Sequence, residues 1–365
     1  MKRQGSSKSF VERDLYTSKF RRIETRDIEK YFFGDIDNKA SPAVDYFENF
    51  THPPEAVGSA LQDILLYMST QKLRTPKGLS SLSSKIGTNN KDVILQQMLQ
   101  LREYHCAIWT ECIWLIADAF QSNTKFIVSD HPVTVYNREC GPRSQWCRES
   151  NDPDIWLHGT HTIFPLSIDK VLILTNLSWV RNPYQSAIRP RPNPNPFRNA
   201  IFKLLEVQIL RHLSEEEVRQ INFIIKSRAY HYIAAAKEEW LYPEEHVSKS
   251  GWNTFGHGYL FMPDPRPIHT GGEIIMGFKN GSSAAFDEYG RRPWDGDYNK
   301  ESKSHSEWDT LAWFQGEFAQ LFGPVRRGRC MSVADIDNER DSDEFHQYHL
   351  GLQKKFYKER RRKQT

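Results

Sequence analysis

The N-terminal third of the chain carries apolar residues at helical spacing. One stripe repeats every three or four positions, the period that places side chains on a single face of a helix, and consists of Val57, Leu61, Ile64, Leu65 and Met68. Pro53 and Pro54 precede it, where a first helical turn tolerates proline. A second stripe predicts a long helix from 92 to about 120. The Ser-, Gly- and Asn-rich stretch 77–91 between them predicts a loop.

The middle of the chain changes to short β-branched and aromatic runs, which are typical of strands. These runs cover 126–128, 133–136, 163–166 and 171–174. Further along, Ser214 with Glu217 three residues later is the pattern of a helix N-terminal capping box. Apolar positions from 218 to 233 then repeat at helical spacing, so we expect helical structure there.

After Trp252 the pattern again favours strands, at 259–262, 273–278 and 284–286, followed by a helix that ends at Gly323 and Pro324. The sequence therefore predicts an α+β fold: an N-terminal helical bundle packed on a small mixed β-sheet, then two helices and a β-rich C-terminal extension. We expect a polar segment at 1–13, a main domain at 14–245, an extension packed on it at 246–330, and a polar, basic tail at 331–365.

Composition narrows the class of protein. With 38% hydrophobic and 13% aromatic residues among 365, the chain can bury a real core. No apolar run approaches the roughly 18–20 residues that span a bilayer, and the polar start lacks the pattern of a signal peptide. Five cysteines, scattered and without Cys-x-x-Cys pairs, are typical of reduced thiols. We therefore expect a cytoplasmic protein with no membrane contact.

Charge is unevenly distributed along the chain. The net charge is +3, but the segment 354–365 alone carries seven basic residues against Glu359, which leaves −3 for the rest. That balance does not favour a nucleic-acid interface spread over the folded body. The tail could make weak, salt-sensitive contacts with nucleic-acid phosphates, through Lys354, Lys355, Lys358, Arg360, Arg361 and Arg362. A solvated terminus without a partner explains the same residues.

Several short motifs follow one another in a recognisable order. They are DLYT at 14–17, QKLRTP at 71–76, a segment with Trp109 and Trp114, FIVSDHPV at 126–133, and FPLS at 164–167. In these motifs the chain resembles the bacterial family known as domain of unknown function 4238, over about 14–239. Members usually begin with a His-Tyr-Val-Pro segment that has no counterpart before Asp14, so either the sequence begins late or this is a divergent member. The resemblance implies a fold but no established activity.

The motif at 126–133 contains the first candidate site. Asp130 ends an apolar strand, with Ser129 before it and His131 after it, and strand ends are where polar site residues collect. A carboxylate beside an imidazole is suited to acid–base or metal chemistry. The same residues also favour a simple turn, because Asp and Ser bond nearby backbone N–H groups and Pro132 fixes the bend.

Other candidates lie outside this motif. Gln71 and Arg74 share one face at the end of a predicted helix, and the Arg guanidinium suits a phosphate or carboxylate, although a cation there also complements the helix dipole. His161 is a second candidate proton carrier. Together with the nearby cysteines and His158 it matches no standard zinc spacing. A divalent cofactor is conceivable, but no metal ligands are assigned.

Two functional hypotheses follow. The first is a hydrolase acting on a phosphate-containing substrate, either nucleic acid or a nucleotide. In it, Asp130 is the acid–base or metal-binding carboxylate and His131 or His161 carries protons, while the substrate contacts are Gln71, Arg74 and Ser129. The alternative is a non-catalytic binding, sensor or interaction protein in which these motifs are turns. No Walker A, His-Glu-x-x-His or Gly-x-Ser-x-Gly motif decides between them.

Overall fold

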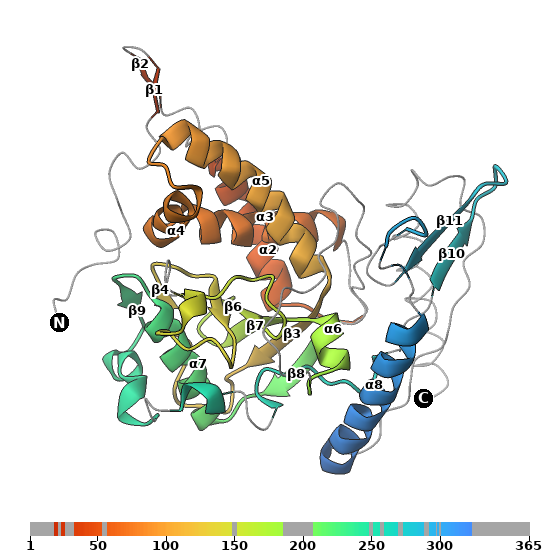
Figure 1. The fold of residues 1–365 in the computed structure, drawn as a ribbon. Helices are drawn as coiled ribbons and strands as arrows, with labels where there is room; N and C mark the ends of the chain where they lie inside the picture. The colour runs from red at the N-terminus through yellow and green to blue at the C-terminus, as the bar shows by residue number, and fades with distance from the viewer. Residues whose placement is uncertain are drawn as a thin grey trace.

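The fold was analysed in a computed structural model (Figure 1), which describes residues 18–20, 23–25, 33–52, 57–147, 152–184, 207–247, 251–255, 259–268, 273–287, 292–296, 298 and 301–322. The motif at 14–17, the polar segment 1–13 and the basic tail 331–365 lie outside these residues.

Four helices form the N-terminal bundle: α2 (Gly34–Glu48), α3 (Val57–Arg74), α4 (Pro76–Ile86) and α5 (Lys91–Thr110). A short hairpin, β1 (Ser18–Phe20) and β2 (Ile23–Thr25), precedes them. Side chains of α2 and α3, including Phe47 and Met68, are fully buried in one apolar cluster with Trp109 of α5. The helix predicted from the apolar stripe is therefore confirmed, and its residues Leu61, Ile64, Leu65 and Met68 lie in or against this cluster.

The loop predicted over 77–91 is wrong for its first ten residues, which belong to α4. Thr75 caps this helix by accepting a hydrogen bond from the Gly78 N–H at 3.2 Å, Pro76 occupies the first turn, and Gly87 ends the helix with a φ of 72°. These are standard start and stop signals. The serines obscured them, because serine also favours loops.

The helix predicted from 92 to 120 is also wrong beyond Thr110, since Cys112–Asp118 forms strand β3. All seven residues of β3 are buried. A strand covered on both faces reads as a continuous apolar run, which cannot be distinguished from a buried helix by periodicity alone.

The predicted mixed sheet is confirmed. It has five strands in the order β5 (Thr134–Tyr136), β6 (His161–Pro165), β7 (Lys170–Asn176), β3 and β8 (Gln208–His212). All neighbours are antiparallel except β3 and β8, which run parallel. Beside it, the short β4 (Val128–Ser129) pairs with β9 (Ile233–Ala234).

The two faces of the sheet pack against different helices, as Figure 1 shows. Along β3, Trp114 and Ile116 join the apolar cluster of the N-terminal bundle. Leu115 and Ala117 join a second cluster with α7 (Glu215–Arg228). The capping box predicted for α7 is present, with Ser214 and Glu217 bonding each other's backbone N–H. The molecule is thus an α+β fold with the sheet between two helical layers.

The remaining elements are short or lie toward the C-terminus. Helix α6 (Leu177–Arg181) follows β7 and packs against α8 (Glu301–Phe322), with the hairpin β10 (Glu273–Gly277) and β11 (Ser283–Asp287) between them in sequence. The residues predicted as a strand at 259–262 form a bend, with Tyr259 at a φ of 73°. Single-turn 3₁₀ helices cover Gln145–Cys147, Glu238–Leu241, Pro243–Glu245 and Trp252–Thr254. None of the helices described is long and apolar enough to cross a membrane.

Candidate functional site

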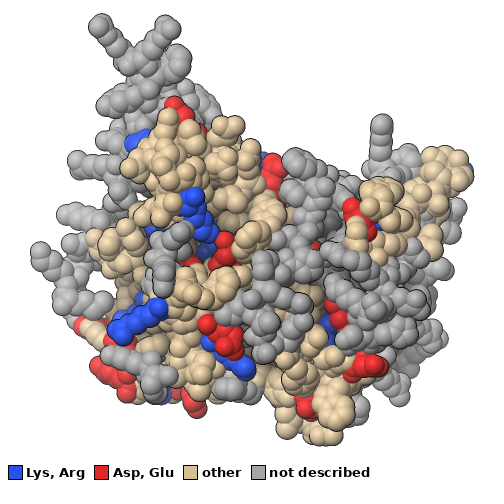
Figure 2. All heavy atoms as spheres, in the orientation of Figure 1, with Lys and Arg blue, Asp and Glu red and all other residues tan. Residues whose placement is uncertain are grey.

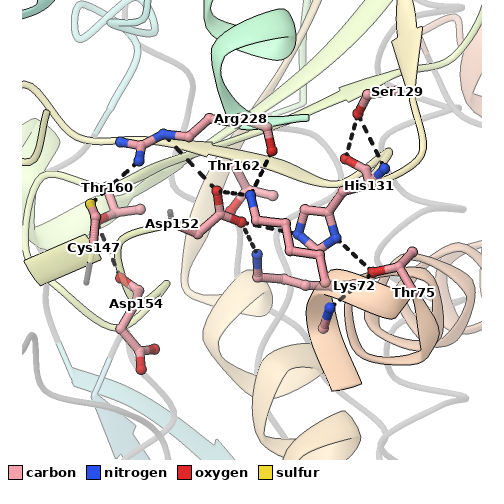
Figure 3. A network of polar contacts seen from close by, with 12 residues as sticks. Lys72, Thr75, Ser129, His131, Cys147, Asp152, Asp154, Thr160, Thr162 and Arg228 are labelled. Carbon is pink, nitrogen blue, oxygen red and sulfur yellow. Dashed lines mark hydrogen bonds and ion pairs between the residues drawn. The ribbon is translucent and has the colours of Figure 1, made fainter. Parts of the chain in front are cut away.

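A buried carboxylate, Asp152, lies where the helical bundle meets the sheet and gathers four basic side chains around it (Figure 3). Its Oδ1 is 2.8 Å from the Lys77 Nζ and 4.0 Å from the Arg228 Nε. Its Oδ2 is 3.3 Å from the Lys72 Nζ and 3.0 Å from the His131 Nε2. We refer to these five residues, together with Thr75, as the Asp152 cluster.

Local structure brings these side chains together from distant parts of the sequence. Lys72 lies in the last turn of α3 and Lys77 in the first turn of α4, and the sharp corner between the two helices directs both amines to one place. Arg228 is the last residue of α7, on the opposite layer. The Lys77 Nζ also donates to the Arg228 carbonyl oxygen at 2.6 Å, which joins the two layers directly.

The cluster is strongly shielded from water. Lys77 is 3% exposed, His131 2% and Arg228 0%. The most accessible of its charged groups is Lys72, whose side chain is 12% exposed. Among these residues, the side chains of Lys72, Lys77 and Arg228 share one carboxylate. Buried charges are costly unless paired, and within the Asp152 cluster the basic side chains outnumber the carboxylate.

Electrostatics fixes the protonation states. Burial by itself would raise the pKa of Asp152, but Lys77, Lys72 and His131 hold it well below its usual 3.8. Burial lowers the pKa of Lys77 against the attraction of Asp152. Burial also lowers the pKa of His131 to about 4, even though its bond to Asp152 acts in the other direction. At neutral pH, therefore, Asp152 is ionised and the His131 imidazole is neutral.

The second nitrogen of His131 meets a hydroxyl. Its Nδ1 lies 2.7 Å from the Thr75 Oγ1. Because an ionised Asp152 can only accept, the neutral imidazole carries its proton on Nε2 and its Nδ1 accepts from Thr75. The result is a hydroxyl–imidazole–carboxylate chain, the arrangement in which an imidazole can take the proton of a hydroxyl while the carboxylate orients it.

Ser129, predicted to contact substrate, holds the backbone of His131 in place. Its hydroxyl donates to the His131 carbonyl at 3.0 Å and accepts from the His131 N–H at 3.2 Å. These bonds close a tight turn that directs the imidazole into the Asp152 cluster. The structure therefore places two of the predicted residues, His131 and Ser129, at one site.

The carboxylate of Asp130, the predicted acid–base or metal-binding residue, accepts hydrogen bonds from a neighbouring loop. It accepts backbone N–H groups from Tyr230 at 2.9 Å, His231 at 2.7 Å and Tyr232 at 3.0 Å. Its own N–H donates to the Tyr232 carbonyl at 3.0 Å. These contacts support the turn interpretation and give Asp130 a positioning role.

We expect Asp130→Ala to lower the free energy of unfolding by about 1–3 kcal/mol, because it removes a charged acceptor from three N–H groups. Urea unfolding measures this loss, and Asp130→Asn, which keeps one acceptor oxygen, should fall between the alanine variant and the wild type. An Asp130→Ala variant as stable as the wild type would show that the bonds from Asp130 to the 230–232 backbone do not contribute to the stability of the fold.

The other predicted residues have contacts elsewhere. Arg74 forms a double hydrogen bond with Asp37, at 2.7 and 2.8 Å, which ties α3 to α2. Gln71 hydrogen-bonds the side chain of Tyr67 on the same helix. His161 is buried against the rings of Trp179 and Phe261, at centroid distances of 4.8 and 5.2 Å, and its Nδ1 meets the Thr175 hydroxyl at 2.8 Å. Their proposed roles with substrate stay predictions.

The sequence patterns did not single out Asp152, Lys77 or Arg228, although two of them left a signal. Lys77 lies in a first helical turn, where the helix dipole disfavours a cation, but the loop predicted over 77–91 concealed this signal. Arg228 continues the apolar stripe of α7, where a charge is unexpected. Asp152 left none. Within the described residues, no group of three or more His, Cys, Asp or Glu side chains could hold a metal ion.

Fold and site together define an α+β protein with a buried, positively charged polar cluster between its helical bundle and its sheet. Residues 89–239 match the family described as Protein of unknown function (DUF4238), which confirms the resemblance over that segment. The motifs at 14–17 and 71–76 lie outside it. The matched segment includes His131, Asp152 and Arg228, whereas Lys72, Thr75 and Lys77 precede it. No curated protein and no solved structure gave a significant match.

Proposed function

We propose that this chain is a hydrolase acting on a phosphate-containing substrate, a nucleotide or nucleic acid, and that the Asp152 cluster is its site. The observation that carries this proposal is the Thr75–His131–Asp152 chain flanked by Lys72, Lys77 and Arg228.

The charge of the cluster favours an anionic ligand. Three cations around one carboxylate attract an additional negative group, and phosphate oxygens accept hydrogen bonds from Lys and Arg. A phosphoryl group that gains negative charge on its departing oxygen is stabilised most where fixed cations lie in a water-excluded site. Lys72 is the charged group through which such a ligand would enter, because it is the most exposed of the set.

His131 supplies the proton transfer in this proposal. Its imidazole is neutral at pH 7 because burial lowers its pKa to about 4, so Nδ1 can accept a proton. As the oxygen of the Thr75 hydroxyl, or of a water in its place, bonds to phosphorus, Nδ1 takes its proton and the bond from phosphorus to the leaving group breaks. The imidazolium, stabilised by Asp152, then returns that proton to the departing oxygen. If Thr75 is the nucleophile, a second attack by water releases phosphate and restores the hydroxyl. Asp130 and Ser129 are positioning residues in this proposal. Asp130 holds the 230–232 loop, and Ser129 orients His131.

The burial of the same residues favours a second candidate. Apart from Lys72, every member of the cluster is at most 7% exposed, which suits a non-catalytic binding, sensor or interaction protein whose charged core fastens the helical bundle to the sheet. Removing the imidazole distinguishes the two candidates, because a purely structural cluster has no activity to lose.

The test is phosphate release from a panel of nucleotides, oligonucleotides and simple phosphomonoesters by the wild type and by His131→Gln. We expect the variant to lose about 10²- to 10⁴-fold in rate, as removal of a general base does, while a thermal melt confirms that it folds. His52→Gln is the control, since His52 is a half-buried imidazole outside the Asp152 cluster that bonds the Val207 carbonyl at 2.7 Å. Equal rates for wild type and His131→Gln, or no release from any substrate, would refute the proposal.

We further propose that the protein acts in the cytoplasm, supported by the scattered cysteines, of which Cys106, Cys112, Cys140 and Cys147 are free thiols. Contact of nucleic acid with the basic tail is a separate proposal, supported by the charge of that segment alone.

A further inference from the structure

Three consecutive aromatic side chains stand exposed immediately after α7. Tyr230 is 42% and Tyr232 46% exposed, and His231 between them is exposed as well. The Tyr230 and His231 ring centroids are 3.9 Å apart, and those of His231 and Tyr232 are 6.1 Å apart in an edge-to-face arrangement. We call residues 230–232 the aromatic loop.

The aromatic loop is held rigidly although its side chains face water. Asp130 accepts all three of its backbone N–H groups. The following residue, Ile233, pairs with Ser129 in the two-stranded sheet of β4 and β9. Exposed aromatic rings on a fixed backbone are typical of contact surfaces, because little conformational entropy remains to be lost on binding.

The aromatic loop is linked to the Asp152 cluster at two points. Asp130, which holds it, is the neighbour of His131. The Arg228 carbonyl, which binds the Lys77 Nζ at 2.6 Å, is two residues before Tyr230, a span of about 7 Å in a fully extended chain. A ligand with an anionic group and an aromatic ring could therefore reach both.

We propose that the aromatic loop stacks the base of a mononucleotide whose phosphate is bound at the Asp152 cluster. This inference rests on the proposed function and narrows its substrate from phosphate compounds in general to nucleotides. Aromatic side chains bind bases through stacking, which tolerates any base because each has a π face.

A mononucleotide fits better than a long nucleic acid. A polynucleotide needs a basic groove that follows its backbone, whereas the chain without its tail carries −3. Figure 2 likewise shows Lys and Arg interspersed with Asp and Glu over the described part of the face in view, without a continuous basic path. The Asp152 cluster offers cations at one place only, enough for one phosphate group.

Equilibrium dialysis with AMP and with ribose 5-phosphate, which has the phosphate but no base, tests the inference. The wild type should bind AMP at least about tenfold more tightly than ribose 5-phosphate, as one stacked base provides. Tyr230→Ala and Tyr232→Ala should each remove most of that preference without weakening ribose 5-phosphate binding, and Tyr230→Phe should keep it. Tyr184→Ala is the control, because Tyr184 is 54% exposed and lies beside Phe314 of α8.

The outcomes separate this inference from the proposed function. Equal binding of AMP and ribose 5-phosphate overturns base stacking but leaves the phosphate site intact. A preference for AMP that survives both alanine substitutions also overturns the assignment to this loop. If neither compound binds the wild type, the phosphate site fails, and the inference fails with it. A preference lost only in the alanine variants of the loop supports the inference.

Discussion

Asp152→Ala should lower the free energy of unfolding by about 3–5 kcal/mol, the largest effect that we expect from a single substitution in this protein. Removing one partner of a buried ion pair leaves the other charge uncompensated, and such losses have this magnitude. Here a single carboxylate faces Lys77, Lys72 and Arg228. With Asp152 gone, the buried cations would repel one another.

Urea unfolding at pH 7 measures this effect, and Asp154→Ala is its matched control. Asp154 lies two residues away and also pairs with a lysine, Lys85, at 2.8 Å, but the Lys85 side chain is 47% and the Asp154 side chain 33% exposed. An exposed pair contributes at most about 1 kcal/mol. Should the two variants lose equal stability, Asp152 would not be the charge centre that the contacts indicate. If Asp152→Ala does not fold, Asp152→Asn, which keeps the shape and the hydrogen-bonding oxygen, provides the measurement.

The second large effect concerns pH. Burial lowers the pKa of His131 from 6.5 to about 4, so below pH 6.5 the unfolded chain takes up a proton that the folded protein does not. The folded state therefore loses stability as the pH falls from about 6.5 to about 4. A difference of 2.5 pKa units corresponds to about 3 kcal/mol.

The contribution of His131 is isolated by comparing wild type with His131→Gln across this range. Two other imidazoles change stability in the same direction, because burial lowers the pKa of His105 to about 3 and partial burial also lowers that of His52. The free energy of unfolding of the glutamine variant should fall less steeply with acid, so that the gap between the two proteins narrows from pH 7 to pH 4. Parallel curves would mean that His131 is not buried in its neutral form.

Much of the fold was predictable from local signals. The stripe beginning at Val57 and the capping box at Ser214 each indicated a helix that the structure confirms, because amphipathic spacing and caps act within a few residues. The errors at β3 and α4 have different causes. Strand β3 is buried on both faces, so its apolar run does not distinguish a strand from a buried helix. In α4 the serines, which also favour loops, obscured the local start and stop signals at Thr75, Pro76 and Gly87.

The site was less predictable, because its geometry depends on long-range contacts. His131 and Ser129 were identified because they lie in a short polar motif at a strand end. Asp152 contacts Lys77 across 75 positions of the sequence, and no periodicity reports a contact of that kind. Arg228 was the available clue, since a charged side chain on a buried apolar stripe needs a partner, whereas Lys77 fell in the stretch predicted as a loop.

The motif at 126–133 now divides into two roles. Its histidine belongs to the Asp152 cluster, where it connects a hydroxyl with a carboxylate. Its aspartate, although adjacent in sequence, bonds the backbone of the aromatic loop. Successive residues of an extended or turning chain point in different directions, so a compact polar motif need not form a single catalytic group.

Calorimetric titration of inorganic phosphate at low ionic strength tests most directly whether the Asp152 cluster is a phosphate site. We predict that the wild type binds phosphate and that Lys72→Met, which removes the most accessible cation of the cluster, binds at least about tenfold more weakly, a difference of 1.4 kcal/mol. Lys39→Met, at an exposed pair with Asp35 on α2, should bind as the wild type does. Binding unchanged by Lys72→Met, or absent from the wild type, would contradict the assignment.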